Sequence, residues 1–398
     1  MKLLRHLPQA SGPALLGSFA SLASQALFAA FLLKLFEPAA VGVFSLVNQV
    51  AFSWATLALA QSPLSLLADR ADPAHGARRA WLASAVRMVW LLPLAALAWF
   101  WSSPATGFHA SPLAWLAAIA ITQMTWALAQ SLVLRTGPGL SIFLVRCVPP
   151  ALAVLIAGVG AFAFPRSEPT ALLLAAVVGY AVGSLWLFPT LSARAPVEPG
   201  DAAQADGHDD RSSRLKLVHT LFDLASATLI AVQWTRVWGP VEAGYLLVLL
   251  RVYGFVPALV HTAWAQVLLS KGEARVRSSV AVGAACCAIV LVLGLLVQAA
   301  LAFGWLAPEW AALRRYIWPL AIWQMAACLF GSLSHAPFLA GRARAYSLQC
   351  IGVDTMLLGL LVLAPLVQVA PGDWIMVVAG CMTGALLLQA AHFRALAR

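Results

Sequence analysis

Apolar stretches of about 20 residues or more recur along nearly the whole chain, separated by short breaks rich in Pro, Gly and charge. Each stretch is long enough to cross a bilayer as a helix with some tilt. Helices are the expected form because backbone exposed to lipid must satisfy its hydrogen bonds internally. The pattern predicts twelve membrane-spanning helices, at residues 13–36, 41–68, 81–102, 112–134, 140–163, 170–191, 215–238, 243–269, 280–304, 316–340, 347–369 and 374–394.

One predicted pair of helices organises this pattern. The stretch from Thr235 to Lys271, with a tight turn at Gly239-Pro240, is echoed by the stretch from Leu33 to Asp69. A shift of 202 residues superposes the two regions without a gap and matches Leu22-Ala23-Ser24 with Leu224-Ala225-Ser226, Lys34 with Arg236, Pro38 with Pro240, Gly42 with Gly244 and Gln49 with Arg251. The Pro and Gly matches carry the most weight, because Leu and Ala matches are frequent in so apolar a chain. The sequence therefore predicts an internal duplication.

A polar segment at residues 192–214, rich in Asp and bearing Pro and Gly, separates the two copies. Its composition predicts a flexible cytoplasmic linker between an N-terminal six-helix lobe at residues 1–191 and a C-terminal six-helix lobe at residues 215–398. Six helices return the chain to its starting side, so the lobes form a parallel repeat about an axis along the membrane normal. We expect an all-α polytopic membrane protein with its substrate site at the interface of the lobes.

Composition and charge support a membrane protein and set its orientation. Hydrophobic residues make up 62% of the chain and charged residues 10%, whereas a soluble domain is about half apolar and a quarter charged. If the N-terminus is inside, the outer side carries only five basic residues, Lys34, Arg166, Arg236, Arg314 and Arg315, and all the others except Arg251 fall inside. Both termini are therefore expected in the cytoplasm. The first apolar run is expected to be an uncleaved helix, because another span follows at once.

The sequence offers no pattern for a cofactor, a metal site or nucleic-acid binding. The six cysteines all fall inside apolar stretches and form no CxxC or CxxH pattern, so neither a disulfide framework nor a metal site is predicted. There is no phosphate-binding GxxxxGK motif, and every predicted outer loop is too short, at about ten residues or fewer, to carry a catalytic domain. The net charge of +10 is explained by membrane orientation. An enzyme is therefore not expected.

Arg251 is the most informative charged residue within the predicted helices. It follows the start of its helix by about eight residues, or roughly 12 Å in a hydrocarbon core about 30 Å thick. Intramembrane charges are costly and are usually functional. Arg251 either forms a structural ion pair inside the bundle or lines a cavity for an anionic substrate. Gly254 and Pro257 follow it as a candidate hinge, and His261 lies on an adjoining face.

Asp223 is the most informative membrane carboxylate. It lies about eight residues into the seventh predicted helix, and His219 precedes it by one turn on the same face. The two side chains either relay protons or couple transport to an ion, or Asp223 forms a salt bridge with Arg251, Arg87 or Arg146. Asp354, in the eleventh predicted helix, offers the same alternatives.

Four further polar residues in the first lobe are candidates for substrate binding. Arg87 and Arg146 each lie about six residues from an inner helix end, where they either snorkel to the interface or extend a cationic path into the cavity. Asn48 and Gln49 occupy the repeat position of Arg251. Their amides either bond neighbouring helices or bind sugar hydroxyls. The two lobes would then differ, with charge recognition concentrated in the second.

These stretches also resemble a known family. KLFEPAAVGVFSLVNQ and WGPVEAGYLLVLLRVYGFVPALVHTAWAQVLLSKG resemble the first and second, and the seventh and eighth, spans of the polysaccharide (O-antigen, Wzx-type) flippases, which belong to the multidrug/oligosaccharidyl-lipid/polysaccharide exporter superfamily. The resemblance covers roughly a quarter of the chain. It implies two six-helix lobes around a central cavity and a lipid-linked (polyprenyl diphosphate) oligosaccharide as substrate, moved across the bacterial inner membrane. Arg251, then Arg87 and Arg146, would hold the anionic diphosphate and sugar.

Other functions stay open beside the flippase. Asp223 and Asp354 would suit a cation-coupled multidrug exporter of the same superfamily, although Arg251 would repel a cationic drug. A membrane enzyme such as an O-antigen polymerase is a further class, and a scaffold protein is another. For a flippase the expected partners are the lipid-linked oligosaccharide, membrane lipids and other polysaccharide-assembly proteins.

Overall fold

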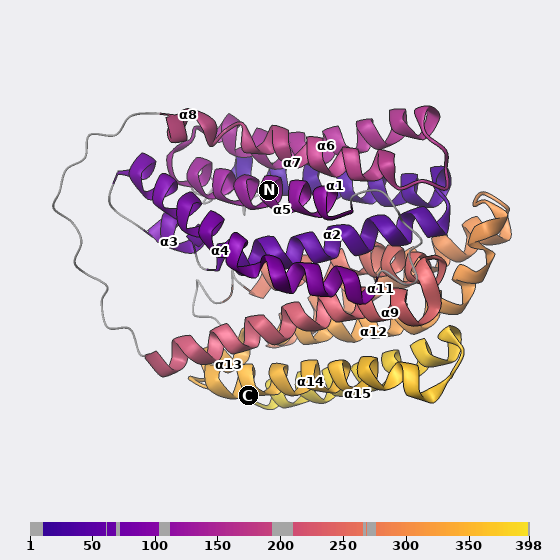
Figure 1. Ribbon diagram of the computed structural model, residues 1–398. Helices are drawn as coiled ribbons and strands as arrows, with labels where there is room; N and C mark the ends of the chain where they lie inside the picture. Colours follow the sequence, from indigo (N-terminus) through magenta and orange to yellow (C-terminus); the bar gives the residue numbers. More distant parts are fainter. Residues whose placement is uncertain are drawn as a thin grey trace. The chain divides into compact units, whose positions relative to one another are not determined.

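The chain folds as helices throughout the part that the structure describes. A computed structural model describes residues 11–60, 62–68, 72–102, 112–192, 210–265, 268 and 276–396, and it has no strand within them (Figure 1). The chain divides into two compact units, Met1–Ala205 and Asp206–Arg398. Most of the predicted linker, residues 193–209, lies outside the described residues.

The first unit is built from helices that pack as neighbours around one core. Its helices are α1 (Ser11–Leu35), α2 (Pro38–Leu59), α3 (Ser62–Ala68), α4 (Pro73–Ser102), α5 (Pro112–Thr136), α6 (Gly139–Ala163), α7 (Thr170–Ser184) and α8 (Phe188–Ser192). Helix α1 packs against α6, α7 packs against α5 and α6, and α2 packs against α4 and α5.

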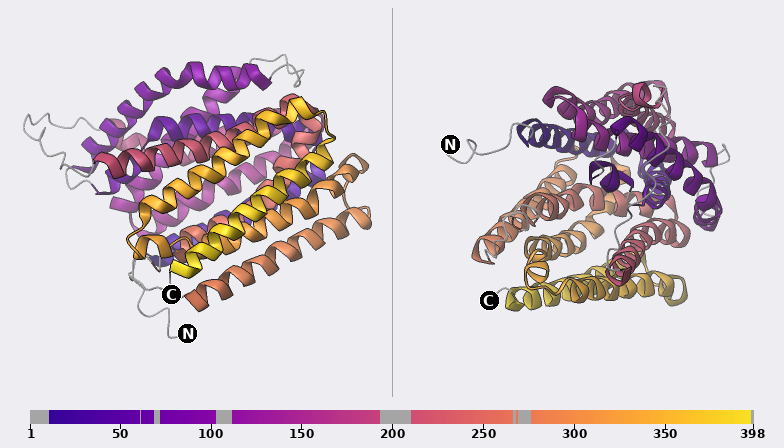
Figure 2. Two further views of the ribbon diagram at one scale, coloured as in Figure 1. Left: turned by 90° about the horizontal axis from the view of Figure 1, so that it is seen from below. Right: turned by 90° about the vertical axis from the view of Figure 1, so that its left-hand side faces the viewer.

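The second unit has the same kind of construction. Its elements are α9 (Asp210–Leu259), the π-helix η3 (Val260–Ala265), α11 (Val276–Ala302), the 3₁₀ helix η4 (Pro308–Leu313), α12 (Arg314–Leu333), α13 (Ala336–Leu339), α14 (Ala343–Val367) and α15 (Pro371–Leu396). Gly239, with φ 86° and ψ 172°, interrupts α9. We call residues 210–238 its first arm and residues 240–259 its second arm. Figure 2 shows the helices of each unit running side by side.

The duplication extends over all six helices of each unit. Adding 202 to the first residue of a long helix in the first unit gives the start of its counterpart in the second to within three residues. The match has no offset for α5 and α12, which begin at Pro112 and Arg314. The packing repeats as well, because α14 packs against α9 as α6 packs against α1, and α15 packs against α12 as α7 packs against α5. The repeat predicted from one hairpin therefore holds for the whole pattern of helices within each unit.

The length and composition of these helices confirm the predicted class, an all-α polytopic membrane protein. Nine helical segments of the described chain are long and apolar enough to cross a bilayer, and one of them, Leu217–Leu259, contains both arms of α9. Two shorter apolar helices, Ala23–Leu35 and Thr170–Ser184, complete the set. Together they account for the twelve predicted spans.

Three spans that were predicted as continuous helices are interrupted in the structure. The span 41–68 breaks after α2, the span 170–191 breaks after α7, and the span 316–340 breaks after α12. In each case the helix ends four or five residues before a proline, Pro63, Pro189 or Pro337. A proline has no N–H to bond the carbonyl four residues earlier, and it favours the first turn of a new helix. A fourth span, 243–269, changes from α- to π-helix at Val260.

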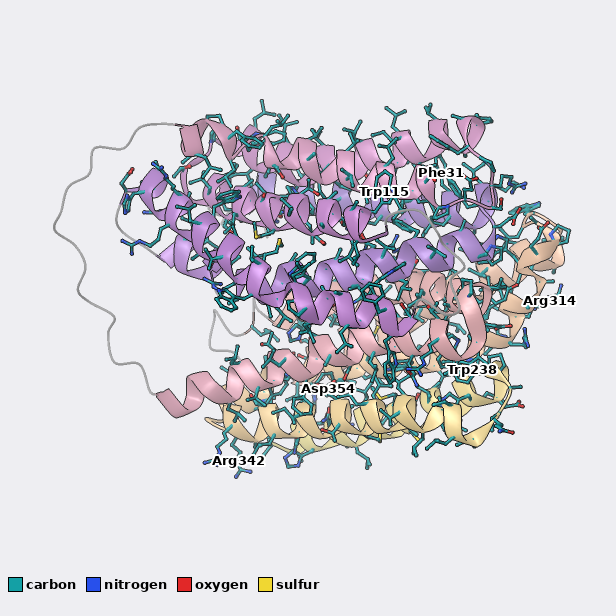
Figure 3. All side chains as sticks on the ribbon, viewed as in Figure 1. Phe31, Trp115, Trp238, Arg314, Arg342 and Asp354 are labelled. Carbon is teal, nitrogen blue, oxygen red and sulfur yellow. The ribbon has the colours of Figure 1, made fainter. Side chains whose placement is uncertain are left out.

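In each unit, side-chain hydrogen bonds link the end of the first helix to the loop between the fifth and sixth long helices. In the first unit the Arg166 guanidinium donates to the carbonyls of Lys34 (2.8 Å) and Leu35 (3.0 Å). In the second unit the Trp238 indole donates to the carbonyl of Val369 at 3.2 Å. Figure 3 shows Trp238 and Arg314 at one end of the second unit and Arg342 at the other. Arg314 and Arg342, which are predicted for opposite sides of the membrane, thus lie at opposite ends of this unit.

Candidate functional site

The membrane carboxylates of the second unit lie between two parallel helices, α14 and the first arm of α9. The His219 ring packs edge-on against Tyr346, with ring centroids 5.8 Å apart. Seven residues further along, the Ser226 hydroxyl donates to the carbonyl of Asp354 at 3.4 Å. Residue numbers therefore increase together along the two helices from the first contact to the second, which means that the helices run in the same direction. The register puts Asp223 on the face that carries Asp354.

Asp223 is the electrostatic centre of this region. It interacts with the rings of His219 and His261 and with the carboxylate of Asp354. We call His219, Asp223 and Asp354 the carboxylate cluster. Asp223 is exposed on the surface of the second unit, whereas His219 and Asp354 are half-buried. Two carboxylates that repel one another can share a bound proton, and an imidazole beside them can deliver one. The cluster is therefore suited to bind and release protons inside a membrane bundle.

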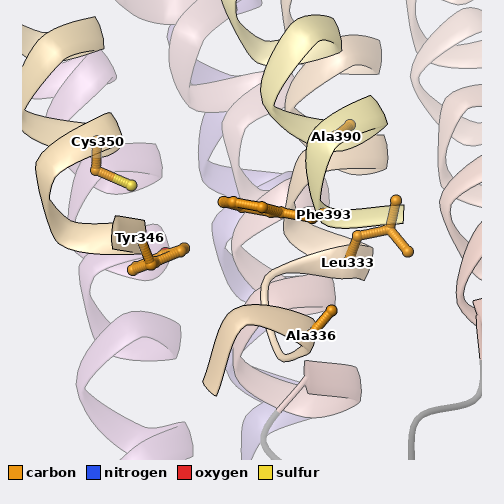
Figure 4. Close-up of a cluster of buried hydrophobic side chains, with 6 residues drawn as sticks. All are labelled: Leu333, Ala336, Tyr346, Cys350, Ala390 and Phe393. Atoms are coloured by element: carbon orange, nitrogen blue, oxygen red, sulfur yellow. The ribbon is translucent and has the colours of Figure 1, made fainter. Parts of the chain in front are cut away.

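A group of buried, mostly apolar side chains, which we call the apolar plug, packs around Tyr346 at one end of the carboxylate cluster. Tyr346 is buried and stacks with Phe330, and it also contacts Phe338 and Phe393 at centroid separations of 5.0 and 5.6 Å. Figure 4 shows Tyr346 and Cys350 on α14 facing Phe393 of α15, with Leu333, Ala336 and Ala390 completing the buried group. The plug fixes the ring of Tyr346, and through it the position of His219.

The π-helix η3 brings a further histidine to the carboxylate cluster. Its His261 is exposed and forms a 3.0 Å hydrogen bond through Nδ1 with the hydroxyl of Ser334, a buried residue in the turn after α12. A second bond, from the Trp264 indole to Ser279 of α11 at 3.0 Å, holds the same segment. Sequence reasoning paired Asp223 with His219 but did not join His261 to them. No local signal shows that contact, because it depends on the packing of η3 against α12.

Arg251 lies on the second arm of α9 and is half-buried. The arm begins at Pro240 rather than at residue 243, so Arg251 lies roughly 16 Å along it instead of 12 Å, near mid-membrane depth. The candidate hinge residues Gly254 and Pro257 lie within the helical part of the arm, and the change of helix type comes after them at Val260. The roles predicted for Arg251 and for the hinge remain predictions.

The four candidates of the first unit lie in different surroundings. Arg87 donates through Nη1 to the carbonyls of Ala58 (2.6 Å) and Leu59 (3.0 Å) and through Nη2 to Ser62 Oγ (3.2 Å). It thereby caps the broken end of α2, which is a structural role. Arg146 is half-buried on α6. Arg146 lies on the side of α6 that faces α1, because a Cβ added at Gly17 of α1 would lie 3.4 Å from the Cβ of Arg146.

Asn48 and Gln49 are half-buried on α2, and the Gln49 amide donates to Ser53 Oγ at 3.5 Å. This bond lies within one helix, so it does not link α2 to a neighbour. As substrate ligands, Asn48, Gln49, Arg87 and Arg146 stay predictions. Among the described residues no group of three or more His, Cys, Asp or Glu side chains is placed to hold a metal ion.

The helices define this chain as a multi-pass, all-α membrane protein. No protein-family model matches it. No curated protein is significantly similar to it in sequence. Two solved structures are similar along nearly their whole length. A MATE protein in complex with MaL6 is 15% identical, with 97% of this chain and 95% of that chain covered and a TM-score of 0.46. The inward-facing conformation of a multidrug resistance MATE family transporter of the MOP superfamily is 14% identical, with 96% and 93% covered and a TM-score of 0.49.

Proposed function

We propose that this protein is a proton-coupled flippase that moves a lipid-linked oligosaccharide across the bacterial inner membrane. Its two six-helix units would rock about a site near the membrane midplane, which faces first the cytoplasm and then the periplasm. Both termini would lie in the cytoplasm. The lipid tail would stay in the bilayer while the diphosphate and sugars cross.

The observation that carries the proposal is the carboxylate cluster of the second unit. Asp223 and Asp354 interact within helices that cross the membrane, and His219 stands beside them. Ionisable groups at such depth are costly, and they usually mark ion or proton pathways in transporters. Asp223 is exposed, so a proton can reach it from water in an open state. The cluster supports coupling of substrate movement to a proton gradient.

Arg251 supports the anionic substrate. Its guanidinium lies about half-way along a membrane helix, is always charged, and matches the geometry of a diphosphate in a bidentate contact. The second arm that carries Arg251 runs directly into η3. Arg251 and His261, which interacts electrostatically with Asp223, therefore belong to one continuous helical segment, through which proton binding and substrate binding can influence each other.

The test is transport by purified protein in lipid vesicles with a fluorescent polyprenyl-diphosphate oligosaccharide, with and without an imposed proton gradient. Wild type should flip the lipid faster with the gradient. Arg251→Ala should lose most flipping, Arg251→Lys should retain a part, and Asp223→Asn should lose the response to the gradient. Arg277→Ala is the matched control, because Arg277 is exposed at the start of α11. Unchanged flipping by a correctly inserted Arg251→Ala variant would refute the substrate site.

The same carboxylates favour a second candidate, a proton-coupled exporter of cationic drugs. An exporter of this kind needs anionic side chains that exchange a proton for the drug, and Asp223 and Asp354 supply them. The vesicle assay separates the two functions. Efflux of a cationic dye that is lost in Asp223→Asn, without movement of the labelled lipid, would support the exporter.

A further inference from the structure

The second helix of each unit loses its α-helical geometry at the same position of the repeat. In the first unit α2 ends at Leu59 and Ala60 has a φ of 47°. In the second unit the π-helix η3 begins at Val260, and the shift of 202 residues places Leu59 opposite His261. The two breaks are therefore equivalent, and they differ in the side chains that hold them.

A permanent cation holds the break in the first unit. The Arg87 guanidinium donates to the carbonyls of Ala58 and Leu59, and arginine does not lose its charge at any physiological pH. The same shift takes Arg87 to Ile289, which cannot donate a hydrogen bond. In the second unit the break is held instead by an imidazole, which changes charge between about pH 5 and 8.

The hydrogen bonds around Ser334 favour the tautomer of His261 that carries its proton on Nδ1. The Ser334 hydroxyl donates its one hydrogen to the carbonyl of Gly331 at 2.8 Å. With its hydrogen on that carbonyl, the hydroxyl oxygen accepts the 3.0 Å bond from Nδ1–H of His261. The neutral ring then has a free lone pair on Nε2. Since His261 is exposed, that lone pair can take up a proton.

Close packing against α12 makes the bond to Ser334 feasible. A Cβ at Gly331 would lie 3.5 Å from the carbonyl oxygen of Pro257 and 3.9 Å from the backbone nitrogen and Cβ of His261. These are ordinary van der Waals distances, so the broken helix packs directly beside α12 at Gly331. The surroundings of the ring contain opposing charge, because Asp223 interacts electrostatically with His261, and His219 interacts with both. The N-cap of α13 adds His335 and the first turn of α11 adds Arg277 at the same end of the unit.

We infer that His261 is a proton-binding and positioning residue of the coupling site, in which Nε2 takes up a proton from water while Nδ1–H anchors the π-helix to Ser334. The resulting imidazolium pairs with the Asp223 carboxylate, and on release the proton returns to water, so no other bond changes. Proton binding is thereby linked to the position of η3 and of the second arm that carries Arg251. This inference rests on the proposed proton coupling, but it concerns a residue outside the carboxylate cluster.

The first test uses a variant that keeps the hydrogen bond to Ser334 but has no group that titrates between pH 5 and pH 8. In His261→Asn the amide N–H replaces Nδ1–H as donor to Ser334, but nothing replaces Nε2. We expect flipping by this variant to lose most of its change between pH 5 and pH 8, with a melting temperature close to that of wild type. His392→Asn, exposed near the end of α15, is the control and should keep the wild-type pH profile. A wild-type profile in His261→Asn would overturn the inference.

The second test does not depend on the transported substrate. Hydrogen exchange at the imidazole C2 position, followed by mass spectrometry across pH 5 to 8, gives the titration midpoint of His261 in the purified full-length protein. Asp223→Asn removes the anionic neighbour and should move that midpoint by about half a pH unit or more, whereas His392 should not move. An unchanged midpoint would overturn the inference. If wild type moves no lipid but His261 responds to Asp223→Asn, the proposed substrate fails and the proton site stands.

Discussion

At the scale of single residues, the charged side chains of the membrane helices divide by what they contact. Arg87 donates hydrogen bonds to two backbone carbonyls of α2, those of Ala58 and Leu59. The Leu59 carbonyl has no helical donor, because the residue four positions later is Pro63, which lacks an N–H. Asp223 instead interacts electrostatically with other ionisable groups and stays exposed. A side chain that completes the backbone hydrogen bonding stabilises the fold, whereas one that remains accessible can exchange protons.

Arg87→Met should therefore destabilise the first unit. The carbonyls of Ala58 and Leu59 would lose charge-assisted bonds inside an apolar bundle, at a cost of about 2 kcal/mol. Thermal unfolding in detergent measures this, with Arg79→Met as control, because Arg79 is exposed on the same helix. A variant with wild-type stability that loses only substrate binding would instead favour the substrate role predicted from the sequence.

At the scale of elements, the helices are interrupted where backbone chemistry demands it. Gly239 joins the two arms of α9 with φ 86° and ψ 172°, a conformation that is essentially restricted to glycine. Prolines account for the breaks after α2, α7 and α12 by removing a hydrogen-bond donor. Pro93 is nevertheless accommodated within α4, so a proline alone does not end a membrane helix.

Gly239→Ala should cost about 2 kcal/mol of stability through backbone strain. No atom lies within 4 Å of the added Cβ, so steric overlap does not contribute. Gly254→Ala is the matched control: it adds a Cβ to open space within a helix and should be neutral or stabilise by up to about 1 kcal/mol. Equal melting temperatures for the two variants would contradict the argument. Slower flipping by a stable Gly254→Ala variant would support the candidate hinge.

The contact between α6 and α7 should be equally sensitive to a single methyl group. A Cβ at Gly179 would lie 2.9 Å from the carbonyl oxygen of Pro149, which is backbone and cannot rotate away. Gly179→Ala should therefore destabilise by about 2 kcal/mol through overpacking. Gly380→Ala, on the equivalent helix α15, meets no atom within 4 Å and should leave the melting temperature unchanged. A tolerated Gly179→Ala would mean that the two helices can separate without loss.

At the scale of the whole molecule, the duplication predicts that equivalent loops lie on the same side of the membrane. Six helices separate each loop from its counterpart, so the α6–α7 and α14–α15 loops should both be external. In a variant without the six native cysteines, Ser167→Cys and Gln368→Cys should react with an impermeant maleimide added outside the cell, and Arg342→Cys only after the membrane is opened. Labelling of the two loops from opposite sides would refute the parallel repeat.

Much of the fold was determined by the sequence itself. The lengths of the apolar stretches predicted twelve spans, and the match of Pro38 with Pro240 predicted a repeat that all six helices of each unit follow. Both signals are local, since they depend only on how many apolar residues the bilayer requires and on which residues permit a turn. The helix breaks were also encoded locally, in Pro63, Pro189 and Pro337, but the continuous apolar pattern concealed them.

The candidate site was decided by the tertiary structure. Asp223 interacts electrostatically with Asp354, and His261 forms a hydrogen bond with Ser334, across sequence separations that no periodicity reports. Membrane helices are apolar on nearly every face, so their hydrophobic pattern does not show which face packs against which neighbour. Close packing at small residues such as Gly179, where a Cβ would lie 2.9 Å from the Pro149 carbonyl oxygen, selects the face and the register instead. The sequence by itself therefore determined how many helices cross the membrane and which residues are chemically unusual, whereas packing decided which of those residues act together.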